Sequence, residues 1–176
     1  MNTLVIRRGV VSDALVLSEF AARTFSETFG ASNRPEDMAV FLSTHYSVAL
    51  QSQELNDPNV VVLLAFDDGV LIAYAQLRRN ATPPCVTQSH PIELQRFYVD
   101  KPAHGKGVAQ RLMQSALAVA RLMGGEHVWL GVWEHNPRAI GFYRKYGFED
   151  VGSVDFYVGS DQQTDRVFVA NLSAIL

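Results

Sequence analysis

A short polar loop with two glycines separates an apolar strand from an amphipathic helix. The strand is predicted over residues 92–99, the glycines are Gly105 and Gly107, and the helix is predicted over residues 106–123. Glycine lets a backbone approach a ligand closely. The first N–H groups of a helix have no partner within it and lie at the positive end of its dipole. The loop is therefore predicted to bind an anion such as a phosphate or a pyrophosphate.

Two common phosphate-binding motifs do not match this loop. A P-loop lysine is followed by Ser or Thr, whereas Lys106 is followed by Gly107, and a dinucleotide fingerprint needs a third glycine where this chain has Gln110. The spacing His104-x-x-Gly107-x-Ala109 instead resembles the Q/R-x-x-G-x-G/A motif of the GNAT N-acetyltransferases, with His104 in place of Gln or Arg. In that family the loop holds the pyrophosphate of acetyl-coenzyme A.

A second segment carries the same resemblance. The run Asn136-Pro-Arg-Ala-Ile-Gly-Phe-Tyr-Arg-Lys-Tyr-Gly-Phe148 is similar to the family signature N-x-x-A-x-x-F-Y-x-x-x-G-F. Taken alone, its residues have structural interpretations: Asn136 as a helix cap, Phe142 as core and Gly147 as the end of a helix. The two motifs occur in the family's order, and the resemblance is strongest over residues 92–148.

The resemblance implies a set of contacts to acetyl-coenzyme A. In the family's fold, the strand that leads into the loop parts from its parallel neighbour, and its backbone pairs with the pantetheine amides. His104 either contacts a phosphate or lies on the loop surface. The implied cofactor-binding residues are Phe97, Tyr98, Val99, His104, Gly105, Lys106, Gly107, Val108, Ala109, Asn136, Ala139 and Phe142. No metal is expected, because the five histidines show no ligand spacing.

Two residues are candidates for proton transfer. Acetyl transfer to an amine expels a thiolate and requires an ammonium group to lose a proton. Family members are proposed to use a tyrosine at the position of Tyr143 to protonate the thiolate; the alternative is a ring that packs on the cofactor. Some members place a catalytic glutamate at the position of Glu93; the alternative is a structural or solvated carboxylate.

Strand alternation predicts which residues share a face with that glutamate. Arg96 is expected to be an ion-pair partner within the sheet, with no catalytic role. The two predicted faces are Glu93, Gln95 and Phe97 on one side and Leu94, Arg96 and Tyr98 on the other.

The other elements follow from apolar spacing, caps and turns. Strands are predicted over residues 4–6, 60–66, 70–78, 92–99, 127–133, 148–158 and 164–171, and helices over 13–29, 33–55 with a break, 106–123 and 136–147. Asn33 and Asn136 are predicted helix caps. The crossover helix at 106–123 implies that the strands on either side of it are parallel. We therefore expect one domain over residues 1–176 with the α/β GNAT fold: a mixed, mostly antiparallel sheet of about seven strands flanked by about four helices.

Composition excludes several classes of protein. With 48% apolar residues, 19% charged residues and a net charge of −3, the chain is typical of a globular protein without a nucleic-acid footprint. The apolar run Val60–Phe66 is far shorter than the ~20 residues that a membrane span needs, so a cytoplasmic location is expected. A single cysteine, Cys85, lies in a proline-rich loop away from both motifs, which argues against a covalent cysteine intermediate. Exposed strand edges in the closing hairpin leave a homodimer open.

The predicted function is direct transfer of an acetyl group from acetyl-coenzyme A to a primary amine. Residues 24–29, 35–38 and 156–165 resemble bacterial polyamine acetyltransferases. Glu27, Glu36 and Asp37 could attract a cationic amine, although the last two are equally well explained as first-turn acids of a helix. A polyamine, a peptide N-terminus, a lysine, an amino acid and an antibiotic all remain open as acceptors. The alternative function is a sensor that binds acetyl-coenzyme A without turnover.

Overall fold

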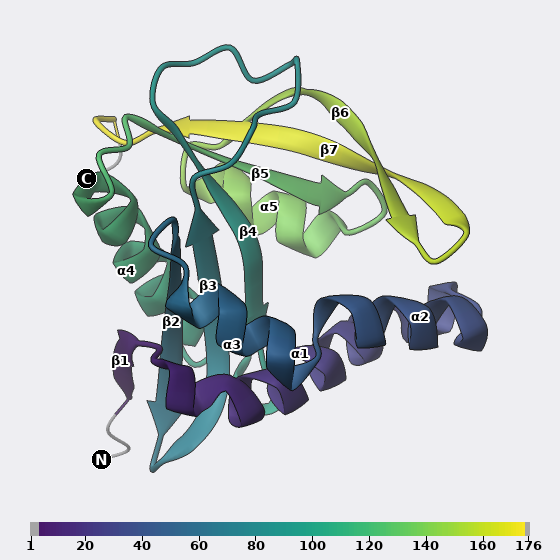
Figure 1. Cartoon of the computed structure of the whole chain (residues 1–176). Helices are drawn as coiled ribbons and strands as arrows, with labels where there is room; N and C mark the ends of the chain where they lie inside the picture. Colours follow the sequence, from purple (N-terminus) through teal and green to yellow (C-terminus); the bar gives the residue numbers. More distant parts are fainter. Residues whose placement is uncertain (1–3, 175–176) are drawn as a thin grey trace.

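The computed structural model describes residues 4–174, which form a seven-stranded sheet between two layers of helices (Figure 1). The strand order is β1-β2-β3-β4-β5-β7-β6, and only the β4–β5 pair is parallel. The strands are β1 Val5–Arg8, β2 Val60–Asp67, β3 Val70–Arg78, β4 Pro91–Val99, β5 His127–Trp133, β6 Glu149–Val158 and β7 Asp161–Asn171. The helices are α1 Ala14–Phe29, α2 Pro35–His45, α3 Val48–Asn56, α4 Val108–Leu122 and α5 Pro137–Lys145. The predicted mixed sheet is confirmed.

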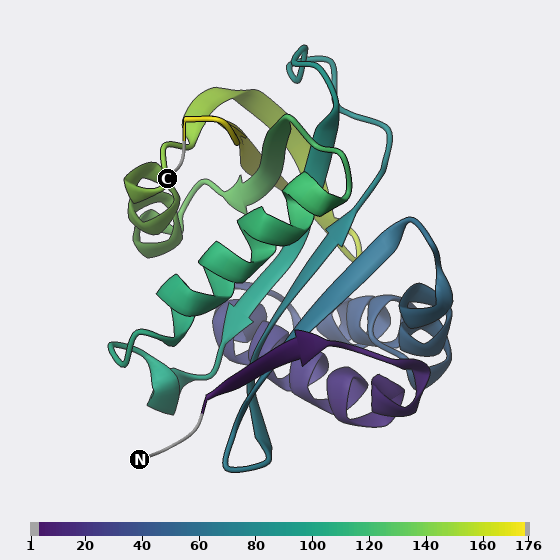
Figure 2. The same cartoon turned by 90° about the vertical axis from the view of Figure 1, so that its left-hand side faces the viewer.

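Different helices cover the two faces of the sheet, as Figure 2 shows. Along β2, Val61, Leu63 and Ala65 pack in the cluster that contains α4, whereas Val62 and Leu64 pack in the cluster that contains α1 and α2. Because both of its faces are buried, β2 is a continuous apolar run rather than an alternating one. Within residues 4–174, no helix is long and apolar enough to cross a membrane.

The helix predicted over residues 33–55 is two helices. Helix α2 ends at His45, and the Ser47 hydroxyl accepts a hydrogen bond from the backbone N–H of Leu50 at 3.3 Å, which caps α3. Serine in this position satisfies a donor that the first turn of α3 leaves unpaired. The predicted break therefore lies at Tyr46 and Ser47.

The prediction that Asn33 caps α2 is wrong. The residue at the cap position is Arg34, whose side chain makes no capping hydrogen bond. Asn33 instead donates from its amide to the backbone carbonyl of Phe29 at 2.8 Å and accepts from Gln163 of β7 at 2.7 Å. Its side chain joins the end of α1 to the closing hairpin, an interaction between distant segments that local spacing does not reveal.

Strand β4 carries one extra residue, Gln95, which changes the predicted faces. Strand β3 pairs with Leu94 and next with Arg96, so that Gln95 has no partner of its own. Such a bulge shifts the alternation of side chains by one residue. Leu94 and Phe97 both lie on the α4 side, and Tyr98 lies on the side of α1. The prediction that Leu94 and Tyr98 share a face is therefore wrong.

Arg96 forms an ion pair, as predicted, but its partner lies on helix α3 and not in the sheet. Its guanidinium lies 2.6 Å from the Glu54 carboxylate of α3 and donates to the Gln76 side chain at 3.1 Å. It also lies 5.0 Å from the centre of the Tyr46 ring. Because Arg96 is only 6% exposed, this pair connects α3 to the middle of β4 through the interior.

Strands β4 and β5 pair at three positions only, where Pro91 to Glu93 lie beside His127 to Trp129. Beyond these pairs, β4 continues along β3 and β5 continues along β7. The parallel arrangement is as predicted. The divergence leaves a gap in the sheet between residues 94–99 and 130–133, which we call the β4–β5 opening.

Candidate active site

The loop between β4 and α4 has the geometry of an anion site. Gly105 and Gly107 have φ angles of 76° and 80°, in the left-handed region that favours glycine. A Cβ added to either residue would meet nothing within 4 Å, so that backbone conformation alone requires these glycines. Gly107 is the residue before the first turn of the 15-residue helix α4. The loop therefore directs the start of a long helix, with its unpaired N–H groups, at one point.

The predicted residues of this loop do not all contribute in the same way. Val108 and Ala109 are in the first turn of α4, where backbone N–H groups have no acceptor within the helix. The backbone N–H of Lys106 is directed at the carbonyl of Ala103, 3.4 Å away, so Lys106 offers a ligand its exposed side chain.

His104 is attached to the end of β4. Its Nε2 lies 2.8 Å from the backbone carbonyl oxygen of Val99. Because a carbonyl only accepts, Nε2 carries the hydrogen of this bond, and Nδ1 is the ring nitrogen left for another partner. The half-buried ring thus holds the loop against the strand. Contact between Nδ1 and a phosphate remains a prediction.

The β4–β5 opening begins beside this loop. Phe97, Tyr98 and Val99 pair with β3 on one side and have no β5 partner on the other. Buried backbone groups need hydrogen-bond partners. A ligand that carries amides, as pantetheine does, suits this strand edge.

Helix α5 brings aromatic side chains to the opening. Asn136 caps it as predicted, accepting from the backbone N–H of Ala139 at 3.1 Å. The ring centres of Phe142 and Tyr143 lie 5.6 and 6.4 Å from that of Phe97 on β4. Asn136, Ala139, Phe142 and Tyr143 therefore lie on an element that packs against the opening.

Tyr143 is protonated at neutral pH. Its side chain is 9% exposed, and burial raises the pKa of its phenol further above the usual value of 10. Among residues 4–174, no side chain or backbone group makes a hydrogen bond to its hydroxyl. Tyr143 also contributes to the raised pKa of Tyr98, after burial and two other tyrosines. A protonated, unshared phenol is the form that a proton donor requires.

Glu93 lies at the closed end of the opening. It is part of the last β4–β5 pair and is 8% exposed. Its carboxylate accepts hydrogen bonds from Arg78 at 2.5 and 3.3 Å and from Asn80 at 3.2 Å. Phe97 lies four positions further along the strand, or roughly 13 Å away. The structure therefore gives Glu93 a structural ion pair, and any catalytic role requires a water between it and the acceptor.

The other face of the opening is enclosed by α1, α2 and the β6–β7 hairpin. The ring centres of Phe29 and Trp133 lie 5.8 Å apart, so the end of α1 meets the end of β5. Asp37 of α2 accepts from the backbone N–H of Ser160 at 2.8 Å and from Arg34 at 2.8 Å, and both contacts lower the pKa of its carboxyl. Asp37 is therefore a structural link to the hairpin rather than a free acid for a cationic amine.

Sequence spacing also missed Gly131 and Asp165, which lie side by side at this face. Asp165 is on β7, opposite Trp133 of β5. The residues that precede and follow it gave no catalytic signature. Only the strand pairing brings its carboxylate to the opening.

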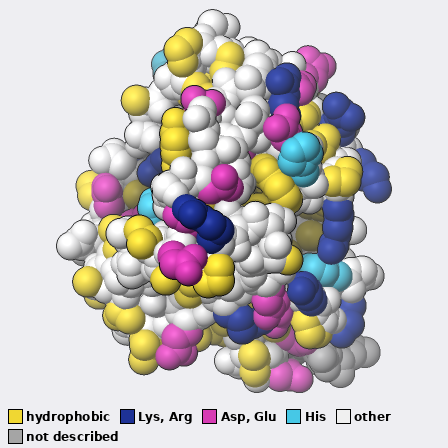
Figure 3. Space-filling view, turned by 90° about the vertical axis from the view of Figure 1, so that its right-hand side faces the viewer, with side chains coloured by type: hydrophobic (Ala, Val, Ile, Leu, Met, Phe, Trp, Pro, Cys, Tyr) yellow, Lys and Arg dark blue, Asp and Glu magenta, His cyan; other side chains and the backbone are white. Residues whose placement is uncertain are grey.

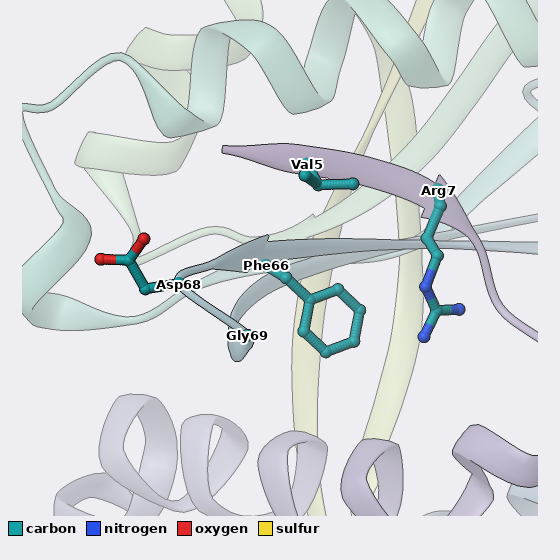
Figure 4. A pocket seen from close by; sticks show the side chains of 5 residues that line it. All are labelled: Val5, Arg7, Phe66, Asp68 and Gly69. Carbon is teal, nitrogen blue, oxygen red and sulfur yellow. The ribbon is translucent and has the colours of Figure 1, made fainter. Parts of the chain in front are cut away.

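Another hollow, of about 500 Å³, lies at the outer edge of the sheet between β1 and the β2–β3 turn (Figure 4). Its charged residue Arg7 is already paired with Asp13 at 2.7 Å and lies 4.8 Å from the centre of the Phe66 ring. Figure 4 shows Asp68 pointing away from Arg7. The hollow therefore contains one paired cation and one carboxylate that point apart, and it lacks the glycine loop and the unpaired strand edge of the β4–β5 opening.

Charge is unevenly distributed around the opening. In Figure 3, Lys and Arg side chains gather along one edge of the molecule. The exposed basic residues of α5 and of the glycine loop include Lys106, Arg138, Arg144 and Lys145. A positive surface next to an anion site attracts a ligand rich in phosphate.

Comparison with known proteins agrees with this geometry. The family model "Acetyltransferase (GNAT) family" matches residues 21–148. An uncharacterised N-acetyltransferase of Mycobacterium tuberculosis (strain ATCC 25618 / H37Rv) is 36% identical over 162 residues, which cover 92% of this chain and 99% of that protein. A spermine/spermidine N(1)-acetyltransferase of Bacillus subtilis (strain 168) is 31% identical over 64 residues, which cover 36% of this chain and 42% of that protein.

The fold is also similar to a solved structure. The PaiA N-acetyltransferase of Thermoplasma acidophilum, in complex with coenzyme A, matches with a TM-score of 0.77, over 96% of this chain and 99% of that chain, at 21% identity. That likeness concerns the fold, whereas the family model and the mycobacterial relative concern the sequence itself. On this evidence the chain belongs to the GNAT family of N-acetyltransferases.

Proposed function

We propose that the protein transfers an acetyl group from acetyl-coenzyme A to a primary amine by direct attack. One observation carries the proposal: the β4–β5 opening has the anion loop at its mouth and the protonated Tyr143 at its wall. The donor needs a pyrophosphate site, an edge for amides and an acid near its sulfur, and we assign these roles to the glycine loop, the unpaired edge of β4 and Tyr143.

Residues of the chain fit the donor along its length. The backbone of Gly105 to Ala109 suits the pyrophosphate, with Lys106 and His104 beside it, and the unpaired edge of Phe97 to Val99 suits the pantetheine arm. When bound, acetyl-coenzyme A supplies an activated thioester. Helix α5, with Asn136, Ala139 and Phe142, is proposed to cover the pantetheine arm on the face of the sheet where α4 lies.

Tyr143 is the proposed proton donor to the departing thiolate. Its raised pKa keeps the phenol protonated until a strong base forms beside it. Cys85 does not take part, because it packs with Val86 and Trp129 and lies against Gly152 of β6. The amine therefore attacks the thioester itself, without a covalent enzyme intermediate.

The proposed acceptor is a cationic amine, and a polyamine is the first candidate. The partial likeness to the spermine/spermidine acetyltransferase of Bacillus subtilis supports a polyamine. Of the acids predicted to attract it, Asp37 is occupied by Ser160 and Arg34, and Glu27 pairs with Arg23 at 3.0 Å. A peptide N-terminus satisfies the same chemistry and is the main alternative.

The first prediction concerns turnover. Thiol release from acetyl-coenzyme A, corrected for hydrolysis, is measured with spermidine, spermine, amino acids and short peptides. We expect turnover with at least one polyamine. Turnover with peptides alone would retain the reaction and refute the polyamine assignment. Coenzyme binding without turnover on any acceptor would favour the sensor function.

The second prediction tests the anion loop. In Gly107→Ala, the added methyl group meets no atom, but the left-handed backbone becomes strained by ~1–2 kcal/mol. If the backbone relaxes to relieve this strain, the N–H groups of the loop no longer point at the anion site. Coenzyme A affinity should therefore fall about tenfold, the equivalent of ~1.4 kcal/mol. Calorimetric titration measures this. The control is Gly69→Ala in the β2–β3 turn, which has the same φ of 80° and an equally open surrounding. Equal affinities of the two variants would contradict the loop assignment.

The third prediction tests Tyr143. In Tyr143→Phe the ring and its contacts remain while the proton donor is lost, so kcat should fall by ~10²-fold or more. Coenzyme A affinity should change less than about twofold, because the proposed donation occurs after binding. Tyr146→Phe on the same helix is the control, since its hydroxyl makes only a 3.5 Å contact with the Gln110 carbonyl. A Tyr143→Phe enzyme with normal kcat would assign Tyr143 to packing alone.

The fourth prediction tests Glu93, whose role as base stays a hypothesis. If Glu93 removes the proton through a water, Glu93→Gln lowers kcat by ~10²-fold. The matched variant Arg78→Gln breaks the same ion pair but retains the carboxylate. It should lose stability with little change in kcat. If both variants lose kcat equally, or neither does, Glu93 is a structural carboxylate.

A further inference from the structure

The carboxylate of Asp165 lies against the wall of the β4–β5 opening. Asp165 pairs with Trp133 of β5 and with Val154 of β6. One of its oxygens lies 3.2 Å from the point that a Cβ on Gly131 would occupy. The carboxylate can therefore rest on the β5 backbone because residue 131 has no side chain.

Gly131 lies at the part of β5 where the strands have already parted. The last β4–β5 pair contains Trp129, so Gly131 is two residues, or roughly 6.6 Å, into the opening. Leu130 and Val132 point into the cluster around α4, whereas Trp133 contacts Phe29 of α1. Because side chains alternate along a strand, Gly131 and the carboxylate above it face α1, opposite the side on which Tyr143 packs.

This carboxylate lacks a partner. Throughout residues 4–174, no hydrogen bond or ion pair reaches it, whereas Asp150 on β6 holds Arg166 at 2.7 Å. Arg166 follows Asp165 but points to the other face of the sheet because of strand alternation. Burial raises the pKa of Asp165 to about 6, and the nearby Glu134 adds to the rise. A partly desolvated carboxylate without a cation is unfavourable, so a cation from outside would relieve it.

We propose that Asp165 binds an ammonium group of the acceptor at the α1 face of the β4–β5 opening. The inference rests on the proposed function and specifies its acceptor: a protonated primary amine, whether of a polyamine or of a peptide N-terminus. An anionic group is repelled by Asp165 and Glu134. Coenzyme and acceptor thus approach the opening from opposite faces, the first from the basic side and the second from the side of the unpaired acid.

The groups that face Asp165 define its pH dependence. The turn that follows β5 contributes Glu134 and, beside it, His135, whose Nε2 lies 3.8 Å from the Glu134 carboxylate. Strand β6 contributes the apolar Val154. Only the ionised carboxyl attracts ammonium, so acceptor affinity should fall as the pH decreases through about 6. The fall should appear in kcat/KM, with little effect on kcat at saturating acceptor.

The experiment measures the affinity of spermidine and of trialanine for the coenzyme A-saturated protein by calorimetry. For whichever amine is acetylated, kcat and KM are measured as well. In Asp165→Asn we expect at least tenfold weaker binding of both probes, an equal loss in kcat/KM and less than about threefold change in kcat. The acid limb of kcat/KM near pH 6 should disappear. Glu134→Gln removes a neighbouring charge and is the control: binding should change less than about threefold, with the acid limb displaced to lower pH.

Stability separates this role from a structural one. A carboxyl whose pKa is raised on folding destabilises the native state increasingly as the pH rises above its unfolded pKa of about 4, and the full loss is reached above the folded pKa. The melting temperature of Asp165→Asn at pH 7.5 should therefore equal or exceed that of the parent protein. Gly131→Ala is the second variant, because its methyl group displaces the carboxylate while preserving its charge. It should weaken binding of the probes by at least threefold.

Three results would overturn the inference. They are unchanged binding in Asp165→Asn, equal losses in Asp165→Asn and Glu134→Gln, and absence of binding of either amine by the parent protein. Coenzyme A binding and thiol release by the parent protein are measured in the same series. If the parent protein binds coenzyme A and releases thiol, and Asp165→Asn binds the amines as the parent does, the proposed acetyl transfer stands and only the role of Asp165 is refuted.

Discussion

The structure depends on one interruption in its hydrogen bonding, the divergence of β4 and β5 after three pairs. The crossover through α4 places the two strands side by side. Beyond the three pairs, β4 stays paired with β3 and β5 stays paired with β7, so the two strands diverge. The result is an interior strand edge, where unpaired backbone groups are costly unless a ligand or water satisfies them. A ligand with its own amides can complete the sheet there. The interruption is therefore the proposed site for the donor, and the groups it presents are backbone groups of residues 97–99 rather than their side chains.

The two faces of the opening differ in what surrounds them. On the α4 side are the glycine loop, the start of a helix dipole and the phenol of Tyr143, which burial keeps protonated. On the α1 side are apolar rings and the unpaired Asp165. This division suits a reaction in which a polyanionic donor and a cationic acceptor meet. The buried Arg96–Glu54 pair and the Asp37–Ser160 link hold α3 and α2 against the sheet, and so maintain the second face.

Local patterns predicted much of this architecture. The hairpin of β2 and β3, the long helix α4 and the cap at Asn136 are all short-range features, and each lies where expected. The prediction that Asn33 caps a helix was wrong, because its side-chain oxygen accepts a hydrogen bond from the distant Gln163. The predicted faces of β4 were wrong, because a bulge at Gln95 reverses the alternation of side chains along the strand. Both depend on strand partners that no local pattern specifies.

By itself, the sequence determined the order of the elements, the two motifs and therefore the family, because helix periodicity, caps and glycine conformations are properties of consecutive residues. Tertiary structure decided how the acids are used. Glu93 and Asp37 are held by Arg78 and by Ser160 with Arg34, whereas Asp165, in a segment with no catalytic pattern, lies free at the opening. The state of a carboxylate depends on burial and on partners many residues away, and only the folded chain brings these together.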